Sequence, residues 1–465
     1  MKRLSFPGRG IVSVPLALLL VAASTPGPSQ ARRAQAGTSI SVVYSATYLF
    51  DSNALAATWW NRIKKEFQAQ HPGVTLNLIG EQGSDTDEVN KIYLMLRSAS
   101  TTPDVLSIPT DPIGAMGASG YLQPLNSYVA KWSKWKQISP AIQNESAVNG
   151  QVLAINSGNN DFGLLYDVRI FKKAGLPVPW HPHSWADILA AARKIKALNL
   201  PKTYPIWLMA GQANGAVTVL QGTANLLVGA TQPTIFDAKT NKWVVRSSGL
   251  TDTFQFYHTL ASEGLGAPTG DLFTPQVFAP LYQKWVRAEQ FPIIFAGNWS
   301  PGNCLPFLGG INWPQGKQIY QATAIPTENG QKPGVATAIG GWAFSMTAAS
   351  KHKDLAWALI QLMSDTQNIV DMGNWSGVVP PATVDGFSKA YVNFLPPYNA
   401  EFNSYLQYGT TLPSGAAYPK YVQAMNDTTG QLMQNPSMTA KQAADYFANE
   451  VTQLIGDSSQ VETLS

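Results

Sequence analysis

Apolar positions in the first third of the chain switch repeatedly between the period of a strand and that of a helix. Alternating or continuous apolar runs predict three strands, over Ser39–Tyr44, Val74–Ile79 and Asp104–Ile108. Between them, apolar residues recur at helical spacing, at Leu55, Trp59, Ile63 and Phe67 and again at Val89, Ile92, Tyr93 and Leu96. Strands that alternate with helices in this way predict a parallel α/β sheet.

A later region joins an apolar strand to a helix with a clear start signal. Gly163–Tyr166 is the apolar strand, and a short basic turn follows it. Ser184 and Asp187, three residues apart, form a capping box, so a helix should begin there and continue to about Leu198. The same spacing in Thr439-x-x-Gln442 predicts a final amphipathic helix.

The first 36 residues have the composition of a secretory signal peptide. Three basic residues precede the apolar run Ile11–Ala23, which is shorter than the roughly 20 residues that a membrane-spanning helix needs. Small and polar residues follow, and Ala34-Gln35-Ala36 offers a cleavage site. We expect a cleaved leader over residues 1–36; the alternative is an uncleaved membrane anchor.

Charge and cysteine content exclude several classes of function. The chain has a formal net charge of +4, but the leader holds five basic residues and no acidic one. The remainder keeps 27 of the 32 basic residues against all 28 acidic ones, so its charge supports no nucleic-acid partner. Cys304 is the only cysteine, which excludes an intramolecular disulfide and a cysteine cluster for zinc. The leader also lacks the cysteine that would carry a lipid.

Short motifs follow one another along most of the chain. They are W-x-x-I-x-x-x-F-x-x-x-H-P-G-V from Trp60, T-P-D-V from Thr102, G-Y-L-Q-P-L from Gly120, A-G-L from Ala174, A-G-N-W from Ala296, G-G-W-A-F from Gly340 and A-W at Ala356. In this order they resemble the extracellular solute-binding proteins (family 1) of carbohydrate ABC importers. They are most similar to the trehalose/maltose-type sugar-binding proteins. Each motif is short, so the resemblance depends on their joint order.

The resemblance implies an α/β, type II periplasmic-binding-protein fold, in which a hinge joins two lobes and the ligand cleft lies between them. Its lobes are discontinuous: we expect an N-terminal lobe at 37–152 plus 323–379 and a C-terminal lobe at 153–322 plus 380–465. It further implies a monomeric, extracytoplasmic protein, periplasmic or secreted, that delivers its solute to ABC permease subunits in the membrane. No cofactor is expected.

Sugar recognition requires aromatic faces for the apolar side of a pyranose and amides or carboxylates for its hydroxyls. In open α/β lobes, ligand contacts lie just after the strands. We therefore predict that the tryptophans of predicted helices are core residues and not ligand contacts; they are Trp59, Trp60, Trp185 and Trp357. Position and resemblance together predict these contacts: Tyr48, Asp51, Asp85, Asp111, Asn159, Asn160, Asp161, Asn298, Trp299, Gly341, Trp342 and Trp375, with Gln212 and Asn214 as weaker candidates.

Some of these positions depart from the family or have two interpretations. Asp85 fits a hydroxyl-binding carboxylate and a helix cap equally well. The family usually has an aspartate directly after the third strand, where this chain has Pro109; either Asp111 replaces it or the contact is absent. Disaccharide-binding relatives often have an arginine beyond the position of Trp375, where this chain has Val378–Pro381.

No catalytic constellation stands out in the sequence. There is no nucleophile elbow, phosphate loop or dinucleotide fingerprint. His181 and His183 lack a third ligand at a recognisable spacing, so we predict no metal site. We expect a receptor for a disaccharide or small oligosaccharide, and not an enzyme. The alternatives are a secreted carbohydrate-active hydrolase, a receptor for a polyol or glycerophosphate ester, and an interaction protein without a small ligand.

The low content of charged residues suggests one further hypothesis. Asp, Glu, Lys and Arg together make up only 13% of the chain. A surface poor in carboxylates loses less stability on acidification. An acidic habitat is therefore a hypothesis, and it fails if the purified protein unfolds between pH 7 and about pH 4.

Overall fold

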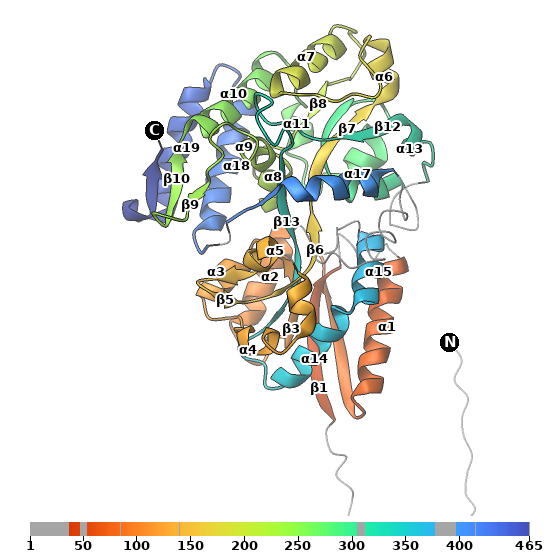
Figure 1. Cartoon of the computed structure of the whole chain (residues 1–465). Coiled ribbons are helices and arrows are strands. Elements are labelled where there is room, and N and C mark those ends of the chain that lie inside the picture. The colour runs from red at the N-terminus through yellow and green to blue at the C-terminus, as the bar shows by residue number, and fades with distance from the viewer. Residues whose placement is uncertain are drawn as a thin grey trace, which may run out of the picture. The chain divides into compact units, whose positions relative to one another are not determined.

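The first of two large sheets in the computed structural model contains both parallel and antiparallel strand pairs (Figure 1). Its strands, in spatial order, are β14 (Gly409–Thr411), β13 (Thr337–Met346), β3 (Val105–Pro109), β1 (Thr38–Ser45) and β2 (Val74–Glu81), and β6 (Ile155–Asn160) also pairs with β13. β1 is parallel to β2 and β3, whereas β13 is antiparallel to β3 and β6. The three predicted strands are confirmed to within two residues. The sheet is mixed, not parallel, because β13 returns from a distant part of the chain.

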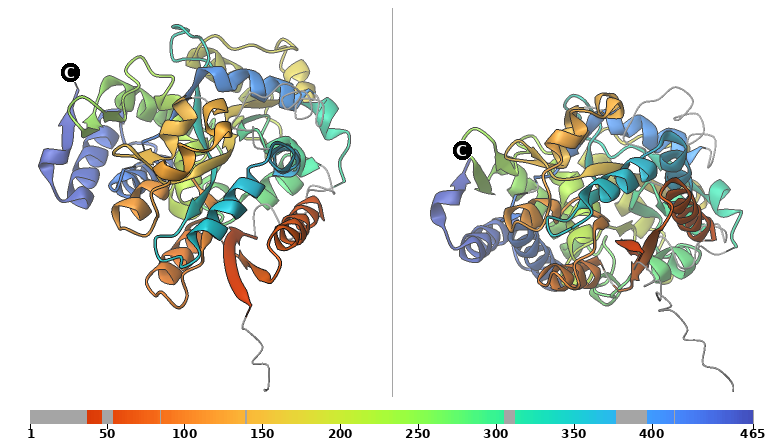
Figure 2. Two further views of the ribbon diagram at one scale, coloured as in Figure 1. Left: turned by 60° about the horizontal axis from the view of Figure 1, so that its bottom comes forward. Right: turned by 90° about the horizontal axis from the view of Figure 1, so that it is seen from below.

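Helices pack against this sheet where the apolar periodicity predicts them. They are α1 (Ala54–Gln70), α2 (Asp85–Leu96), α3 (Ile113–Ala118), α4 (Asn126–Val129), η1 (Ser133–Gln137), α5 (Pro140–Glu145), α14 (Lys353–Met363) and α15 (Thr366–Ser376); a small hairpin, β4 (Ala147–Val148) and β5 (Gln151–Val152), follows α5. In α1, Trp59 and Phe67 are buried, while Leu55 is exposed at the first turn. α1, α14 and α15 lie side by side although they are far apart in sequence (Figures 1 and 2).

A second sheet has mostly antiparallel pairing. Its order is β12 (Tyr320–Thr323), β7 (Phe162–Asp167), β11 (Ile293–Gly297) and β8 (Ile206–Trp207). β7 is antiparallel to β11 and β12, and only β11 and β8 run parallel. The described helices that occur along the chain between β7 and β12 are α6 (Val168–Lys173), α7 (Trp185–Lys196), η2 (Gln212–Asn214), α8 (Ala216–Gln221), α9 (Thr223–Leu227), α10 (Ser248–Ser262), α11 (Thr269–Leu272), α12 (Phe278–Pro280), η3 (Leu281–Trp285), η4 (Ser300–Cys304) and α13 (Gly316–Ile319).

The C-terminal helices and a small sheet pack against the second sheet and its helices. They are α17 (Tyr398–Tyr405), η6 (Leu406–Tyr408), α18 (Tyr418–Gln434), α19 (Ala440–Ile455), η7 (Ser458–Gln460) and a small sheet of β15 (Val461–Thr463), β10 (Lys242–Arg246) and β9 (Phe236–Asp237). Both predicted capping boxes are confirmed. Ser184 Oγ accepts from the Asp187 backbone N–H, and Asp187 Oδ2 accepts from the Ser184 N–H. Thr439 and Gln442 cap α19 in the same way.

Three apolar clusters occur in the part of the chain that the structure describes, and the third includes Val43, Leu106 and Met116. We call the cluster that includes Phe162, Trp207 and Phe447 the second-sheet core, and the one that includes Ile40 and Phe67 the first-sheet core. The four tryptophans left to the core, Trp59, Trp60, Trp185 and Trp357, are all buried. The structure describes residues 37–46, 54–83, 85–138, 140–304, 312–376, 397–413 and 415–464, so the predicted leader lies outside it. The lobe boundaries given above stay a prediction.

The chain passes from the first sheet to the second within a single residue. β6 pairs with β13 in the first sheet, β7 belongs to the second, and only Asp161 separates them. β13 runs beside this crossing (Figure 1). At Gly341 a Cβ would lie 2.2 Å from the carbonyl oxygen of Gly158, so no other residue fits there.

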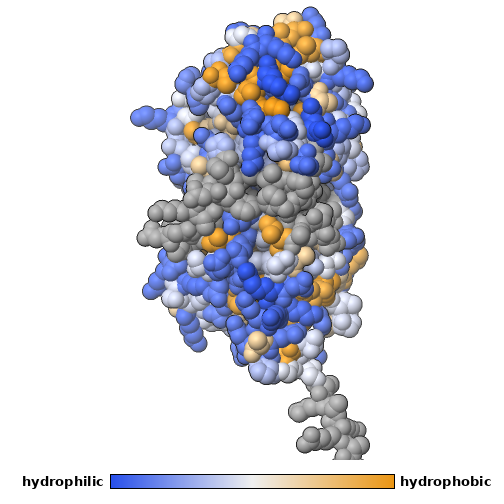
Figure 3. All heavy atoms as spheres, turned by 90° about the vertical axis from the view of Figure 1, so that its right-hand side faces the viewer, coloured by the Kyte–Doolittle hydropathy of each residue, from blue (hydrophilic) through white to orange (hydrophobic). Residues whose placement is uncertain are grey.

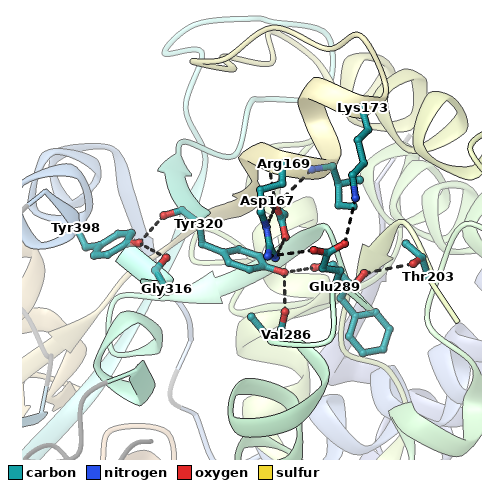
Figure 4. A network of polar contacts seen from close by, with 11 residues as sticks. Asp167, Arg169, Lys173, Thr203, Val286, Glu289, Gly316, Tyr320 and Tyr398 are labelled. Carbon is teal, nitrogen blue, oxygen red and sulfur yellow. Dashed lines mark hydrogen bonds and ion pairs between the residues drawn. The ribbon is translucent and has the colours of Figure 1, made fainter. Parts of the chain in front are cut away.

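Polar contacts fasten the carboxyl end of β7 to its neighbours (Figure 4). The fully buried Asp167 accepts a 2.7 Å hydrogen bond from Arg169 Nη2, and Arg169 Nη1 lies 3.0 Å from Glu289 Oε1. The hydroxyl of Tyr398 donates to the backbone carbonyl of Tyr320. These contacts tie α6, β12 and α17 to β7, so this part of the fold is scaffold.

The described surface is mainly polar. Hydrophilic residues predominate on the face shown in Figure 3, with apolar side chains in smaller groups. Within the described ranges, the exposed large apolar side chains are Leu55, Leu94 and Tyr408. None of the described helices is both long and apolar enough to cross a bilayer.

Candidate functional site

A cavity of about 560 Å³ lies between elements of the first and the second sheet. Its walls come from α2, the turn after β3, α8, β13 and α18. Cavities of roughly 300–1,000 Å³ are typical of small-molecule sites. The cavity is therefore the candidate ligand site.

Five of the predicted contact residues line this cavity. They are Asp111, Asn160, Trp299, Gly341 and Trp342. Each follows or ends a strand, or lies beside the crossing of β6 and β7. Asp111 and Trp299 lie just after strands, where the rule for ligand contacts in α/β lobes expects them. That any of the five residues binds a ligand stays a prediction.

Trp299 lies two residues beyond β11 and is half-buried. Its ring meets Phe162 edge-on, with ring centroids 5.5 Å apart and an interplanar angle of 88°. A second edge-on contact joins it to Phe278 at 6.3 Å. Beneath it, Gly297 leaves no room for a side chain, because a Cβ there would lie 2.0 Å from the ring. These contacts hold the indole at the cavity wall.

Trp342 reaches the cavity from the other side of the crossing. It lies in β13, pairs with Pro109 and Gly158, and is 8% exposed. The ring belongs to the first-sheet core, whereas Trp299 packs against the second-sheet core. Two tryptophans anchored in different cores thus border one cavity.

Asp111 follows β3 and is partly exposed to the cavity. The preceding residue, Thr110, donates its backbone N–H to Gly341 and its hydroxyl to Glu145 Oε1, at 3.0 and 2.7 Å. Glu145 Oε2 accepts a further bond from Asn156, at 2.9 Å. Burial raises the pKa of Asp111 to about 6 and that of Glu145 to about 7.

Four predicted contact residues are described but do not line this cavity. Asn298 Nδ2 donates to the carbonyl of Asn159 at 3.0 Å, and its backbone N–H donates to the carbonyl of Asp161. All three are buried at the crossing. Burial holds the pKa of Asp161 well above its usual range, and among the described residues only its own backbone N–H acts on its carboxylate as a donor. Trp375 is buried in the first-sheet core, 6.1 Å from the ring of Trp59. Their role in binding stays a prediction.

The remaining candidates are placed only in part. Tyr48 and Asp51 lie outside the described residues. Asp85 is the first residue of α2, and both of its interpretations stay predictions. Of the weaker candidates, Gln212 lines the cavity, whereas Asn214 is buried and accepts from the Val277 N–H through its Oδ1.

Sequence reasoning missed residues on two helices that face the cavity. Tyr93 was assigned to the apolar face of α2, yet it lines the cavity beside Asp111. Tyr418, Asn426 and Asp427 reach it from α18. The pattern of a helix does not show whether a half-apolar face meets a core or a ligand. Within the described ranges, no cluster of three metal-ligating side chains is present.

Comparison with known proteins identifies the class. The family model for bacterial extracellular solute-binding proteins matches residues 62–385. This chain belongs to that family. Its members bind solutes, so the protein is a solute-binding protein and not an enzyme.

Solved structures share the fold at low identity. An ABC transporter solute-binding protein from Thermotoga lettingae, bound with α-D-tagatose, is 19% identical with a TM-score of 0.71 and covers 90% of this chain and 100% of its own. A Listeria monocytogenes substrate-binding protein in complex with cycloalternan is 15% identical, with a TM-score of 0.72 and coverage of 90% and 99%. The Thermus thermophilus maltotriose-binding protein is 17% identical, with a TM-score of 0.68 and coverage of 90% and 100%. The predicted α/β periplasmic-binding-protein fold is confirmed.

Curated relatives match only part of the chain. Proteins of Brucella abortus and Brucella suis, whose names describe them as binding proteins, are 28% identical over 153 residues. This match covers 32% of the chain and 34% of each relative. The chain thus spans about a third of the length of these relatives.

Proposed function

We propose that this protein is the extracytoplasmic substrate-binding component of an ABC importer that captures a carbohydrate and delivers it to membrane permease subunits. The substrate class is a disaccharide or small oligosaccharide, as in the trehalose/maltose-type proteins that the sequence resembles. The carbohydrates bound by the similar proteins of Thermotoga, Listeria and Thermus support this proposal.

One observation carries the proposal. Trp299 and Trp342 line one cavity from two different cores, and polar side chains such as Asn160 and Asp111 line the same cavity. Aromatic faces cover the apolar side of a pyranose, while amides and carboxylates bind its hydroxyls. A sugar held by both sides favours the closed arrangement over the open one. The crossing at Asp161 is the proposed hinge.

Titration calorimetry with a panel of sugars tests the proposal. A pyranose face that buries roughly 60 Å² of apolar surface against an indole gains about 1.5 kcal/mol. Trp299→Ala should therefore weaken sugar binding about tenfold. Trp132→Ala is the matched control, because Trp132 packs on Trp357 outside the cavity.

The panel also separates the alternatives. Polyols and glycerophosphate esters belong in it, since binding of these alone would replace the carbohydrate assignment. Chromatography of an oligosaccharide after long incubation should show no cleavage, whereas new products would indicate a hydrolase. A protein whose melting temperature responds to no member of the panel would contradict the proposal.

A further inference from the structure

We propose that the cavity selects a carbohydrate that carries a positively charged amino group over its neutral counterpart. This inference rests on the proposed carbohydrate-binding function of the same site and narrows its substrate class.

The charge of the cavity wall is the first observation. Among the lining residues that the structure describes, the ionisable acids are Asp111, Glu145 and Asp427, and no Lys, Arg or His is present. The basic side chains that form ion pairs in the described ranges, such as Arg62 and Arg169, do so elsewhere. The described wall therefore carries carboxyl groups and no basic side chain that could balance an ionised one.

The three carboxyl groups differ in the hydrogen bonds that they already accept from the protein. Glu145 accepts from Thr110 and Asn156, one bond to each oxygen, and Asp427 Oδ1 accepts from Gln212 Nε2 at 3.0 Å. Asp111 has no hydrogen-bond donor among the described residues apart from its own backbone N–H. Of the three carboxylates, Asp111 alone accepts no hydrogen bond from another described residue, so its capacity for a ligand is the largest.

Aromatic rings flank the open carboxylate. Tyr93 of α2 and Tyr418 of α18 both line the cavity. Burial is the main cause that raises the pKa of both hydroxyls, and the nearby charge of Asp111 raises it further. A carboxylate with aromatic neighbours and no basic residue favours an ammonium group, which gains an ion pair and contact with the rings. A neutral hydroxyl gains only the hydrogen bond.

Unsatisfied amide oxygens are a second, independent observation. Asn426 is 1% exposed and lines the cavity; its Nδ2 donates to the Gly215 carbonyl at 2.8 Å, while its Oδ1 has no partner. Asn160 also lines the cavity, and its Oδ1 likewise lacks a partner. Leaving buried acceptors unpaired is costly. An ammonium brings three donors and no acceptor, which matches a wall with an excess of acceptors.

Titration calorimetry of the full chain at pH 7 tests this selectivity with matched ligand pairs. The pairs are glucosamine with glucose, trehalosamine with trehalose, and the β-1,4-linked dimer of glucosamine with cellobiose. At least one amino member should bind tenfold or more tightly than its neutral partner. Its N-acetylated form, which keeps the bulk without the charge, should bind no better than the neutral sugar.

Substitution of the open carboxylate completes the test. Asp111→Asn should weaken binding of the preferred amino sugar tenfold or more and bring the amino-to-neutral ratio towards one. Asp252→Asn is the matched control, because burial also raises the pKa of Asp252 but this residue lies on α10 outside the cavity. It should leave the ratio unchanged. Thermal melts verify that both variants are folded.

The outcomes separate the two proposals. Neutral members that bind as well as every amino partner would overturn the amine selectivity and leave the carbohydrate proposal standing. An unchanged ratio in Asp111→Asn would likewise overturn it. No binding by any member of these pairs or by any sugar of the panel described above would overturn both proposals.

Discussion

The contact between Gly297 and Trp299 gives a quantitative test of how the cavity wall is built. An alanine Cβ at residue 297 would lie 2.0 Å from Cζ3, 2.2 Å from Cη2 and 2.4 Å from Cε3 of Trp299. Carbon atoms in contact need about 3.5 Å. Gly297→Ala should therefore push the indole aside by about 1.5 Å, because Gly297 is paired with Phe162 of β7 and its backbone has little freedom to retreat.

The cost follows from what the ring loses. Overpacking of this kind typically costs about 1–3 kcal/mol. The edge-on contacts of Trp299 with Phe162 and Phe278 are worth about 0.5–1.5 kcal/mol each, and a displaced ring loses part of them. Trp299 borders the cavity and can yield into it, which relieves part of the strain. We expect Gly297→Ala to lower the free energy of unfolding by about 1–2 kcal/mol and sugar affinity about tenfold.

A double-mutant cycle in urea isolates this contact. Four proteins are compared: the wild type, Gly297→Ala, Trp299→Ala and the double variant. Without the indole, the added methyl group should cost little, so the coupling between the two sites should be about 1 kcal/mol or more. Gly270→Ala is the control, because a Cβ there would meet nothing within 4 Å. An equal cost of Gly297→Ala with and without Trp299 would refute the reasoning.

Three further predictions concern pH, a helix cap and the single thiol. Burial raises the pKa of Asp111 to about 6 and of Glu145 to about 7, and it holds the pKa of Asp161 well above its usual range. The stability that these protonated carboxyl groups contribute to the folded state is complete below about pH 4. It is lost as the pH rises through their raised pKa values, because the unfolded chain ionises first. The free energy of unfolding, measured in urea at several pH values, should fall from pH 4 to 8, less steeply in Asp161→Asn; a rise would contradict this. Ser184→Ala removes the cap of α7 and should cost about 1 kcal/mol, and an unchanged urea midpoint would disprove the role of the cap. Burial raises the pKa of Cys304 to about 11, so an aromatic disulfide reagent should label the native protein far more slowly at pH 8 than the protein in guanidinium; equal rates would count against burial of the thiol.

Local signals in the sequence predicted much of the framework. Periodicity located β1, β2, α1 and α2, and hydroxyl caps located the starts of α7 and α19, because these signals depend on neighbouring residues only. The antiparallel return of β13 was not predicted, since strand direction depends on contacts between distant segments.

Two residues that follow strands, Asp111 and Trp299, were predicted as contacts and line the cavity. At the crossing, Asn160 lines the cavity while Asn159 and Asp161 do not, because successive side chains of an extended chain point to opposite sides. The sequence alone did not reveal this alternation, since the residues on both sides of Asn160 are polar and buried. The contribution of α18, far along the chain, had no local signal.

The order in which the cavity residues occur along the chain has a consequence for biosynthesis. Tyr93 is among the first residues of the cavity wall, and Asp427 of α18 is the last. A chain that ends before α18 lacks one wall, however well its earlier elements fold. Because a ligand stabilises only molecules that can bind it, stabilisation by the solute is reserved for chains that were synthesised and folded almost to the end. The solute then acts as a check on completeness, and truncated products stay open to proteolysis.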